Sequence, residues 1–150
     1  MADLRLEELG AQTIVAANNL TLKPGQEAFI APETYVHAED KLDPAGSWPR
    51  VVRDGDAVVG YIMANFDEDA PEDFLRAALW RINVEAGAQG KGVGRFAVQA
   101  LADEARSRGF SRITVVWGSG AAGPEEFFKA IGFTVVGQTP YGENLGALEL

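Results

Sequence analysis

The chain has 150 residues, of which 47% are hydrophobic and 23% charged, and this fits one globular domain spanning residues 1–150 with a sizeable core. Its formal net charge of −9 argues against binding to nucleic acid or to an anionic membrane surface, because both attract Lys and Arg. The absence of cysteine excludes disulfides and thiolate metal sites, and a single histidine, His37, argues against a histidine-based metal site.

No apolar run approaches the roughly 18 residues that a membrane-spanning helix needs. The N-terminal segment 1–8 is too acidic and polar for a signal peptide. We therefore expect a cytoplasmic protein without a metal, whose partner is a small molecule. A homodimer is compatible with the sequence, which leaves the oligomeric state open.

The first half of the chain predicts a strand, helices and a hairpin. The expected elements are a strand at 3–9, helices at 11–20 and 33–41, and strands at 50–53 and 57–64. A loop is expected at 43–47. Asp54-Gly55-Asp56, between the last two strands, is typical of a tight hairpin turn.

The second half alternates strands and helices. The expected elements are strands at 78–85, 112–117, 133–137 and 146–150, and helices at 93–107 and 124–131. Helix 93–107 has apolar residues at helical spacing, namely Val93, Phe96, Ala97, Ala100, Leu101 and Ala105. The order of all these elements predicts a single-domain mixed α/β fold.

The most informative stretch is Gln89-Gly90-Lys91-Gly92-Val93-Gly94, between the strand at 78–85 and the long helix. Its three glycines at alternate positions allow a sharp turn and bring backbone N–H groups close to a ligand. At the start of a helix, such groups bind phosphate. We therefore expect an anionic, phosphate-bearing cofactor at the mouth of this helix.

Two common phosphate-binding motifs fit this stretch poorly. A P-loop needs Ser or Thr after its Gly-Lys pair and a glycine at position 85, but the chain has Gly92 and Glu85 there. A dinucleotide fingerprint is formally present as Gly92, Gly94 and Ala97. However, four residues separate Glu85, at the end of the strand, from Gly90, and no acidic residue follows the next strand.

The pattern Gln-x-x-Gly-x-Gly after a strand and before a long helix instead resembles the acetyl-CoA motif of the GNAT superfamily of N-acetyltransferases. The stretch 125–133, a short helix ending in Gly132-Phe133, resembles the segment before the last strands of these enzymes. Together the matching parts cover about residues 57–138. The resemblance implies a mixed sheet of about six to seven strands, flanked by helices and splayed at its central strands.

The resemblance also implies which residues bind acetyl-CoA. The backbone N–H groups of Gln89, Gly90, Lys91, Gly92, Val93 and Gly94 would hold the diphosphate. Val84, identified by its spacing from Gln89, would offer a backbone N–H to the thioester carbonyl, which is the role of an oxyanion hole. The alternative interpretation is that Val84 is simply a core strand residue. Both roles are compatible, because only the backbone of Val84 would take part in the chemistry.

The acceptor amine must lose a proton, because an amine of the lysine type has a pKa near 10.4. Glu85, at the end of its strand, is the first choice for the general base. The alternative interpretation of Glu85 is a solvated residue at the end of a strand, with no catalytic role. By strand alternation Asn83 shares its face and could position a water molecule, and Arg81 on that face could pair with Glu85.

Many members of the superfamily carry a tyrosine, the acid for the leaving thiolate, four residues before the Gly-Phe pair. Here that position is Phe128, which we expect to contact the cofactor but which cannot donate a proton. The asparagine that often lies seven residues earlier is Ala121 in this chain. Ser119, Tyr141 and Tyr61 are candidate replacements for the acid, and the sequence does not choose among them.

The segment 23–32 resembles the N-terminal region of bacterial polyamine (spermine/spermidine) N-acetyltransferases, with Gln26 in the shared Gln-x-x-Phe-Ile-Ala pattern. This implies an acceptor site containing Gln26. Glu33 would supply a carboxylate for a polycation, and Tyr35 and Trp48 would supply aromatic faces for ammonium groups. An ordinary solvated helix face is the alternative explanation for the acidic residues.

The leading hypothesis is therefore an acetyl-CoA-dependent N-acetyltransferase for a small primary amine, with a polyamine as the named candidate. Phe128 and Ala121 favour a different class, a non-catalytic acyl-CoA-binding or sensing module. A third hypothesis is an acetyltransferase for protein N-termini or lysines, which would need an open groove.

Overall fold

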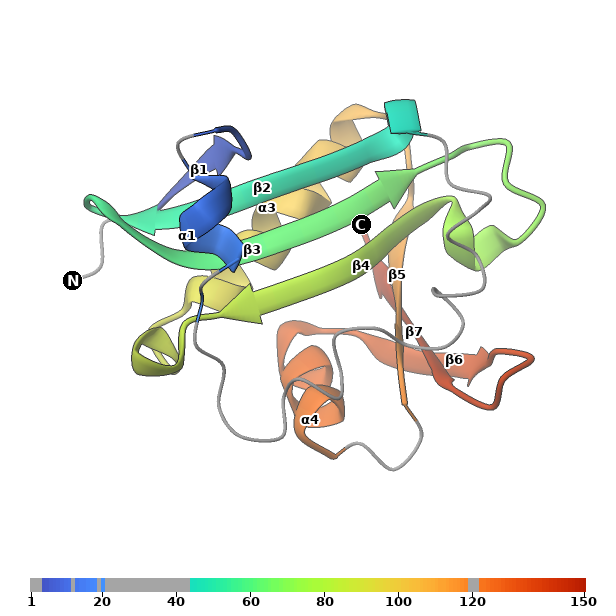
Figure 1. The fold of residues 1–150 in the computed structure, drawn as a ribbon. Coiled ribbons are helices and arrows are strands. Elements are labelled where there is room, and N and C mark those ends of the chain that lie inside the picture. The colour runs from blue at the N-terminus through green and yellow to red at the C-terminus, as the bar shows by residue number, and fades with distance from the viewer. Residues whose placement is uncertain (1–3, 12, 19, 21–43, 119–121) are drawn as a thin grey trace.

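A computed structural model describes residues 4–11, 13–18, 20, 44–118 and 122–150 (Figure 1). Its strands are β1 (Leu4–Glu8), β2 (Ser47–Asp54), β3 (Ala57–Phe66), β4 (Ala77–Val84), β5 (Arg112–Trp117), β6 (Thr134–Gln138) and β7 (Asn144–Glu149). Its helices are α1 (Ile14–Asn18), α3 (Val93–Ser107) and α4 (Ala122–Ile131), with short 3-10 turns η3 (Pro44–Gly46), η4 (Asp73–Leu75) and η5 (Ala86–Ala88).

The seven described strands form one sheet in the order β1-β2-β3-β4-β5-β7-β6. β4 and β5 pair in parallel, and the other neighbours pair antiparallel. α3 lies against one face of the sheet and α1 crosses the other (Figure 1). The mixed α/β fold with a seven-stranded sheet is therefore confirmed.

The sheet opens between β4 and β5. These strands pair only at Ala78–Thr114 and Leu79–Val115, whereas β4 stays paired with β3 as far as Val84. The β3–β4 register shifts at Trp80, which leaves an extra residue on β4, and such a bulge bends a strand. The expected splay at the central strands is confirmed, and it lies at the end of β4 from which the glycine-rich loop leaves.

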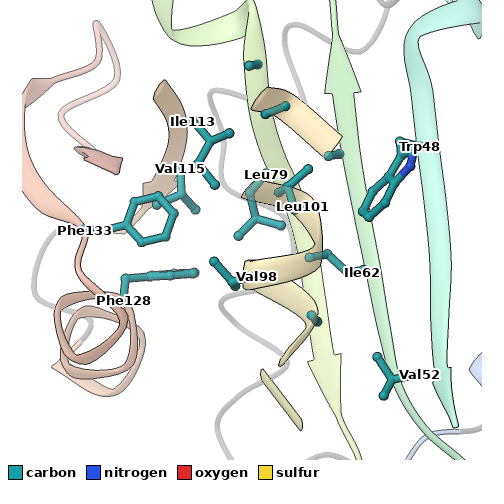
Figure 2. Close-up of a cluster of buried hydrophobic side chains, with 14 of the residues drawn as sticks. Trp48, Val52, Ile62, Leu79, Val98, Leu101, Ile113, Val115, Phe128 and Phe133 are labelled. Carbon is teal, nitrogen blue, oxygen red and sulfur yellow. The ribbon is translucent and has the colours of Figure 1, made fainter. Parts of the chain in front are cut away.

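One hydrophobic core fills the space between the sheet, α3 and α4. Figure 2 shows Val98 and Leu101 of α3 facing Ile62 and Leu79 of the sheet. The buried row of α3 differs slightly from the expected one. Val98 and Ala102 are buried, while Phe96 and Ala100, which we expected in the core, lie at its edge.

The structure corrects the start of β2. This strand begins at Ser47 rather than at residue 50, so part of the expected loop 43–47 is a 3-10 turn and a strand. Pro49 lies inside β2, where it pairs with Met63 of β3. The proline is tolerated because the pairing of β1 ends at Arg50, so β1 does not extend alongside Pro49.

Most of the remaining strand and helix boundaries agree with expectation to within two residues, but α1 covers only Ile14–Asn18 of the helix expected at 11–20. Gly55 has φ of 59°, as the hairpin turn between β2 and β3 requires. α4 begins two residues before Pro124, and β7 begins at Asn144 rather than at residue 146. The helix expected at 33–41 lies outside the described residues. No helix in the described part of the chain is long and apolar enough to cross a membrane.

Candidate active site

The glycine-rich loop has the geometry expected of a ligand-binding turn. Gly90 and Gly92 have φ of 81° and 84°, values that glycine adopts at little cost. The carbonyl of Gly92 accepts a hydrogen bond from the Phe96 N–H at 2.9 Å, which begins α3. A Cβ atom added at Gly90 or Gly92 would meet nothing within 4 Å, so the loop borders open space.

The mouth of α3 is suited to an anion. The N–H groups of its first turn, at residues 93–95, precede the first intrahelical bond and have no acceptor within the helix. These groups and the helix dipole favour negative charge. The exposed Lys91 adds a cation beside them and forms no ion pair with any described residue.

Gly94 has a different role, which is close packing. A Cβ atom at this position would lie 2.6 Å from two ring atoms of Phe127 in α4. Next to it, Nη2 of Arg95 donates a hydrogen bond to the Ala130 carbonyl at 3.0 Å. α4 is thus held directly against the first turn of α3.

The backbone of Val84 faces the opening between β4 and β5. The Glu85 N–H donates to the Val59 carbonyl of β3 at 2.9 Å. Hydrogen-bonded and non-hydrogen-bonded pairs alternate along an antiparallel ladder, so the next pair, Gly60–Val84, is of the non-hydrogen-bonded kind. The N–H and C=O of Val84 therefore point away from β3, toward the side that β5 has left.

The peptide unit that joins Val84 to Glu85 is fixed on both sides. Nε2 of Gln89 donates to the Val84 carbonyl at 3.1 Å, and the Glu85 N–H binds β3 as described. The carbonyl of Glu85 also accepts the Ala88 N–H at 2.9 Å. The loop and the last residues of β4 thus form one rigid unit. The sequence analysis assigned no such role to the Gln89 side chain.

A second group of side chains lies on the face opposite α3. Gly60 packs against Val93 of α3, so the next residue, Tyr61, points to the other face. Tyr61 pairs with Asn83, and Met63 pairs with Arg81, which confirms that Arg81 and Asn83 share this face. Glu85 continues the same row by alternation.

We call the polar groups of this face the β4 polar face (Tyr61, Arg81, Asn83 and Glu85). Burial raises the pKa of the Tyr61 hydroxyl above its usual value of 10.0, and the positive charge of Arg81 partly offsets this shift. Oδ1 of Asn83 is buried and accepts no hydrogen bond from any described residue. Arg81 is exposed and has no ion pair with Glu85 or any other described residue.

Phe128 lies in the core rather than on an open surface. Its side chain is 7% exposed and stacks on Trp117 with ring centroids 5.4 Å apart. It also meets the edge of Phe133, and Figure 2 shows its ring pointing toward Val98. Trp117, which the sequence analysis did not single out, ends β5 and has a buried Nε1 that finds no acceptor among the residues described.

Trp48 does not join the β4 polar face. Its ring is 2% exposed and belongs to the core on the side of α3, as Figure 2 shows. Because β2 begins at Ser47, Trp48 is a strand residue paired with Ala64, and strand alternation directs it inward. The expectation that Trp48 lines an acceptor cleft is therefore corrected.

Several other expected residues lie outside the described part of the chain. These are Gln26, Glu33, Tyr35, Ser119 and Ala121. Tyr141 lies in the turn between β6 and β7 with 46% of its surface exposed. Among the described residues, no group of three or more acidic or histidine side chains is placed to hold a metal ion.

A cleft of about 210 Å³ opens at the other end of β4, beside η4. Arg76 and Arg112 line it, and both pair with Asp73. Ala77, the first residue of β4, also lines the cleft, whereas no residue of the loop or of the β4 polar face does, so the cleft is separate from both.

Comparisons with known proteins agree with this geometry. The sequence model of the acetyltransferase (GNAT) family matches residues 14–133, well over half of the chain. No curated protein sequence matches the chain. An acetyltransferase structure from Thermus thermophilus is similar, with 23% identity, 100% coverage of both chains and a TM-score of 0.74.

Two other solved structures share the fold at lower identity. The PaiA N-acetyltransferase of Thermoplasma acidophilum, in complex with coenzyme A, has 12% identity, 99% coverage of both chains and a TM-score of 0.73. The ribosomal-protein-S18-alanine N-acetyltransferase of Escherichia coli has 17% identity, covers 97% of this chain and 93% of its own, and has a TM-score of 0.67. Fold, loop and family match agree, and the chain belongs to the acetyltransferase (GNAT) family.

Proposed function

We propose that this protein is an acetyl-CoA-dependent N-acetyltransferase that acetylates a primary amine. The observation that carries the proposal is the position of the glycine-rich loop. It joins the mouth of α3 to the end of β4, directly beside the opening between β4 and β5. Family membership supports the reaction class, and coenzyme A is present in the T. acidophilum structure.

The chain offers groups that fit each part of the cosubstrate. The N–H groups of residues 90–94 and the Lys91 ammonium suit a diphosphate, because the space over Gly90 and Gly92 is open. The Gln89 N–H, also expected there, instead donates to the Ala86 carbonyl at 3.5 Å. The Val84 N–H faces the opening, where it suits the oxygen of a thioester carbonyl. A donor fixed in that position stabilises the charge that develops on this oxygen during attack.

The reaction needs a base, for which we propose Glu85. The acceptor ammonium gives its proton to the Glu85 carboxylate, directly or through a water molecule. The amine nitrogen then forms a C–N bond with the acetyl carbon, the C–S bond breaks, and the nitrogen loses its second proton to solvent as the neutral amide forms. The sulfur leaves as a thiolate, whose free thiol has a pKa near 8.5, so it can take a proton from solvent without the acid that Phe128 lacks.

The acceptor is proposed to be a small primary amine. A net charge of −9 steers cations toward the protein, which supports an amine acceptor in general. The case for a polyamine depends on the segment 23–32 together with Glu33 and Tyr35, since Trp48 is buried in the core. A non-catalytic acyl-CoA-binding module is the second candidate, favoured by Phe128 and Ala121, which stand where many members of the family have the tyrosine acid and an asparagine.

Thermal unfolding with coenzyme A, followed by thiol release with acetyl-CoA and a panel of amines, tests the proposal. Coenzyme A at 100 times its Kd should raise the free energy of unfolding by about 2.7 kcal/mol. Lys91→Ala should weaken this effect, whereas Lys129→Ala, which removes an exposed lysine of α4, should not. Binding without turnover on any amine would favour the binding module, and absence of binding would overturn both candidates.

A further inference from the structure

Arg81 stands out among the arginines of the described residues. Six of the others have a carboxylate partner, and two donate to a backbone carbonyl. Arg81 is exposed and has neither kind of partner among the described residues, although the chain has 22 acidic residues against 13 basic ones. A guanidinium that is exposed and has no partner among the described residues is available to an anionic ligand.

The neighbours of Arg81 extend this argument. Asn83, two residues along β4, presents a buried Oδ1 that receives no hydrogen bond from the described residues. A buried acceptor of this kind favours a ligand that brings an N–H donor. Tyr61 pairs with Asn83 across the β3–β4 ladder. Burial raises the pKa of the Tyr61 hydroxyl, and the positive charge of Arg81 lowers that pKa in part. The β4 polar face is therefore suited to a ligand that carries both an anionic group and an N–H donor.

We propose that the acceptor of this enzyme is an amine that also carries a carboxylate, which Arg81 binds. This deepens the proposed acetyl transfer and rests on it. A guanidinium pairs with a carboxylate through two parallel hydrogen bonds, whereas it repels the second ammonium group of a polyamine. Asn83 accepts a hydrogen bond from the amine end of the same molecule.

The spacing along β4 restricts the acceptor further. Arg81 precedes Val84 by three residues, about 10 Å at the usual rise of a strand. The amine reacts beside Val84 and the carboxylate is held by Arg81, so the two groups are several bonds apart. The acceptor class is thus an ω-amino acid or a diamino acid rather than an amine with its carboxylate on the same carbon. The bond changes are those of the proposed transfer, C–N formed and C–S broken.

Three acceptors that share the same six-carbon chain separate the effect of terminal charge on kcat/KM from the effect of molecular size. They are 6-aminohexanoate, hexylamine and 1,6-diaminohexane, which end in a carboxylate, a methyl group and an ammonium group. We expect kcat/KM for 6-aminohexanoate to exceed that for 1,6-diaminohexane by about 10-fold, the effect of one attraction replaced by one repulsion. A ratio measured on one preparation does not depend on the folded fraction.

Arg81→Glu should reverse this ratio, and Arg81→Lys should preserve its direction. Arg106→Glu, which changes an exposed arginine at the far end of α3, should leave the ratio unchanged. A preference of the unaltered protein for the diamine, or a ratio that Arg81→Glu does not change, would overturn the proposal while leaving amine acetylation intact. Failure of all three amines and of glycine, alanine and spermidine would overturn the proposed function itself.

Discussion

Nε2 of Gln89 lies 3.1 Å from the carbonyl oxygen of Val84 and donates a hydrogen bond to it. This bond connects the glycine-rich loop to the last residue of β4. The same peptide unit is tied to β3 through the Glu85 N–H. The orientation of the Val84 backbone and the position of Glu85 are therefore set together, by one side chain of the loop and by the bond to β3.

Replacing Gln89 with Met, which is similar in length but has no N–H, should impair catalysis. The Val84 carbonyl would lose its donor, at a cost of about 1 kcal/mol in the free energy of unfolding. We expect kcat to fall about 10-fold with a smaller change in KM for acetyl-CoA, because positioning rather than binding is lost. Gln99→Met, on the exposed side of α3, is the control, and equal kinetics in the two variants would contradict this role.

Gly94→Ala should destabilise the protein, although alanine normally stabilises a helix relative to glycine by about 1 kcal/mol. The new Cβ would lie 2.6 Å from two atoms of the Phe127 ring, and overpacking of this kind costs about 1–3 kcal/mol. Chemical denaturation provides the measurement. Gly87→Ala, where the added Cβ meets nothing within 4 Å, should change the stability by less than about 0.5 kcal/mol.

Shortening the opposing ring tests the cause of that loss. In the Gly94→Ala, Phe127→Leu double variant the clash is removed, so its destabilisation should be smaller than the sum of the two single effects. A coupling energy of about 1 kcal/mol or more is expected. Additive effects would show that the contact with α4 is not what makes glycine necessary at position 94.

Glu85→Gln should lower kcat by about 100-fold, a typical contribution of a general base, while preserving the size of the side chain. The deficit should shrink as pH approaches 10.4, because a larger share of the amine is then already neutral. Thiol release across a pH series measures both effects. Glu126→Gln, an exposed residue of α4, serves as control, and unchanged turnover in Glu85→Gln would reject the assignment.

Tyr61→Phe should make the protein less sensitive to alkaline pH. Burial holds the pKa of Tyr61 above 10.0 in the folded chain. Below that pH the hydroxyl is protonated in both states and contributes no pH dependence. As pH rises through 10.0, the unfolded chain releases its proton first, so the folded chain binds more protons and the free energy of unfolding falls.

Urea unfolding between pH 8 and pH 11 should therefore give a steeper loss of stability for the unaltered protein than for Tyr61→Phe. Tyr141→Phe, which alters the exposed tyrosine of the β6–β7 turn, should behave like the unaltered protein. Parallel curves for all three proteins would contradict the burial of the Tyr61 hydroxyl as the cause.

Regular patterns predicted most of the fold. Helix 93–107 and strand 112–117 have the bounds that their periodicity and the flanking Gly109 indicated, because their local preferences agree with their packing. The loop geometry at Gly90 and Gly92 was also predictable, since glycine is the residue suited to these backbone angles. The separation of β4 and β5 was implied only by the family resemblance. It could not be predicted from local sequence, because no local pattern indicates how many residues of two strands pair.

The misplacement of Trp48 has a specific cause. Pro49 is a poor strand former, so local propensity does not extend β2 back from residue 50 to Trp48. The pairing of β1 ends one residue short of the proline, which is a tertiary fact that no local pattern contains. The link from Gln89 to Val84 and the unpaired state of Arg81 among the described residues depend in the same way on three-dimensional neighbours.

The short seam between β4 and β5 divides the sheet into two subsheets, β1 to β4 and β5 to β7, joined at two residue pairs. A cosubstrate bound between β4 and β5 would contact both subsheets at once. It would occupy the gap between them and also hold them together. After the cosubstrate is released, the two subsheets would be connected only by the two β4–β5 residue pairs and by the helices that pack against the sheet. In this architecture the narrowest join of the sheet lies beside the residues to which the reaction is assigned, so occupancy of the site and cohesion of the two subsheets are linked.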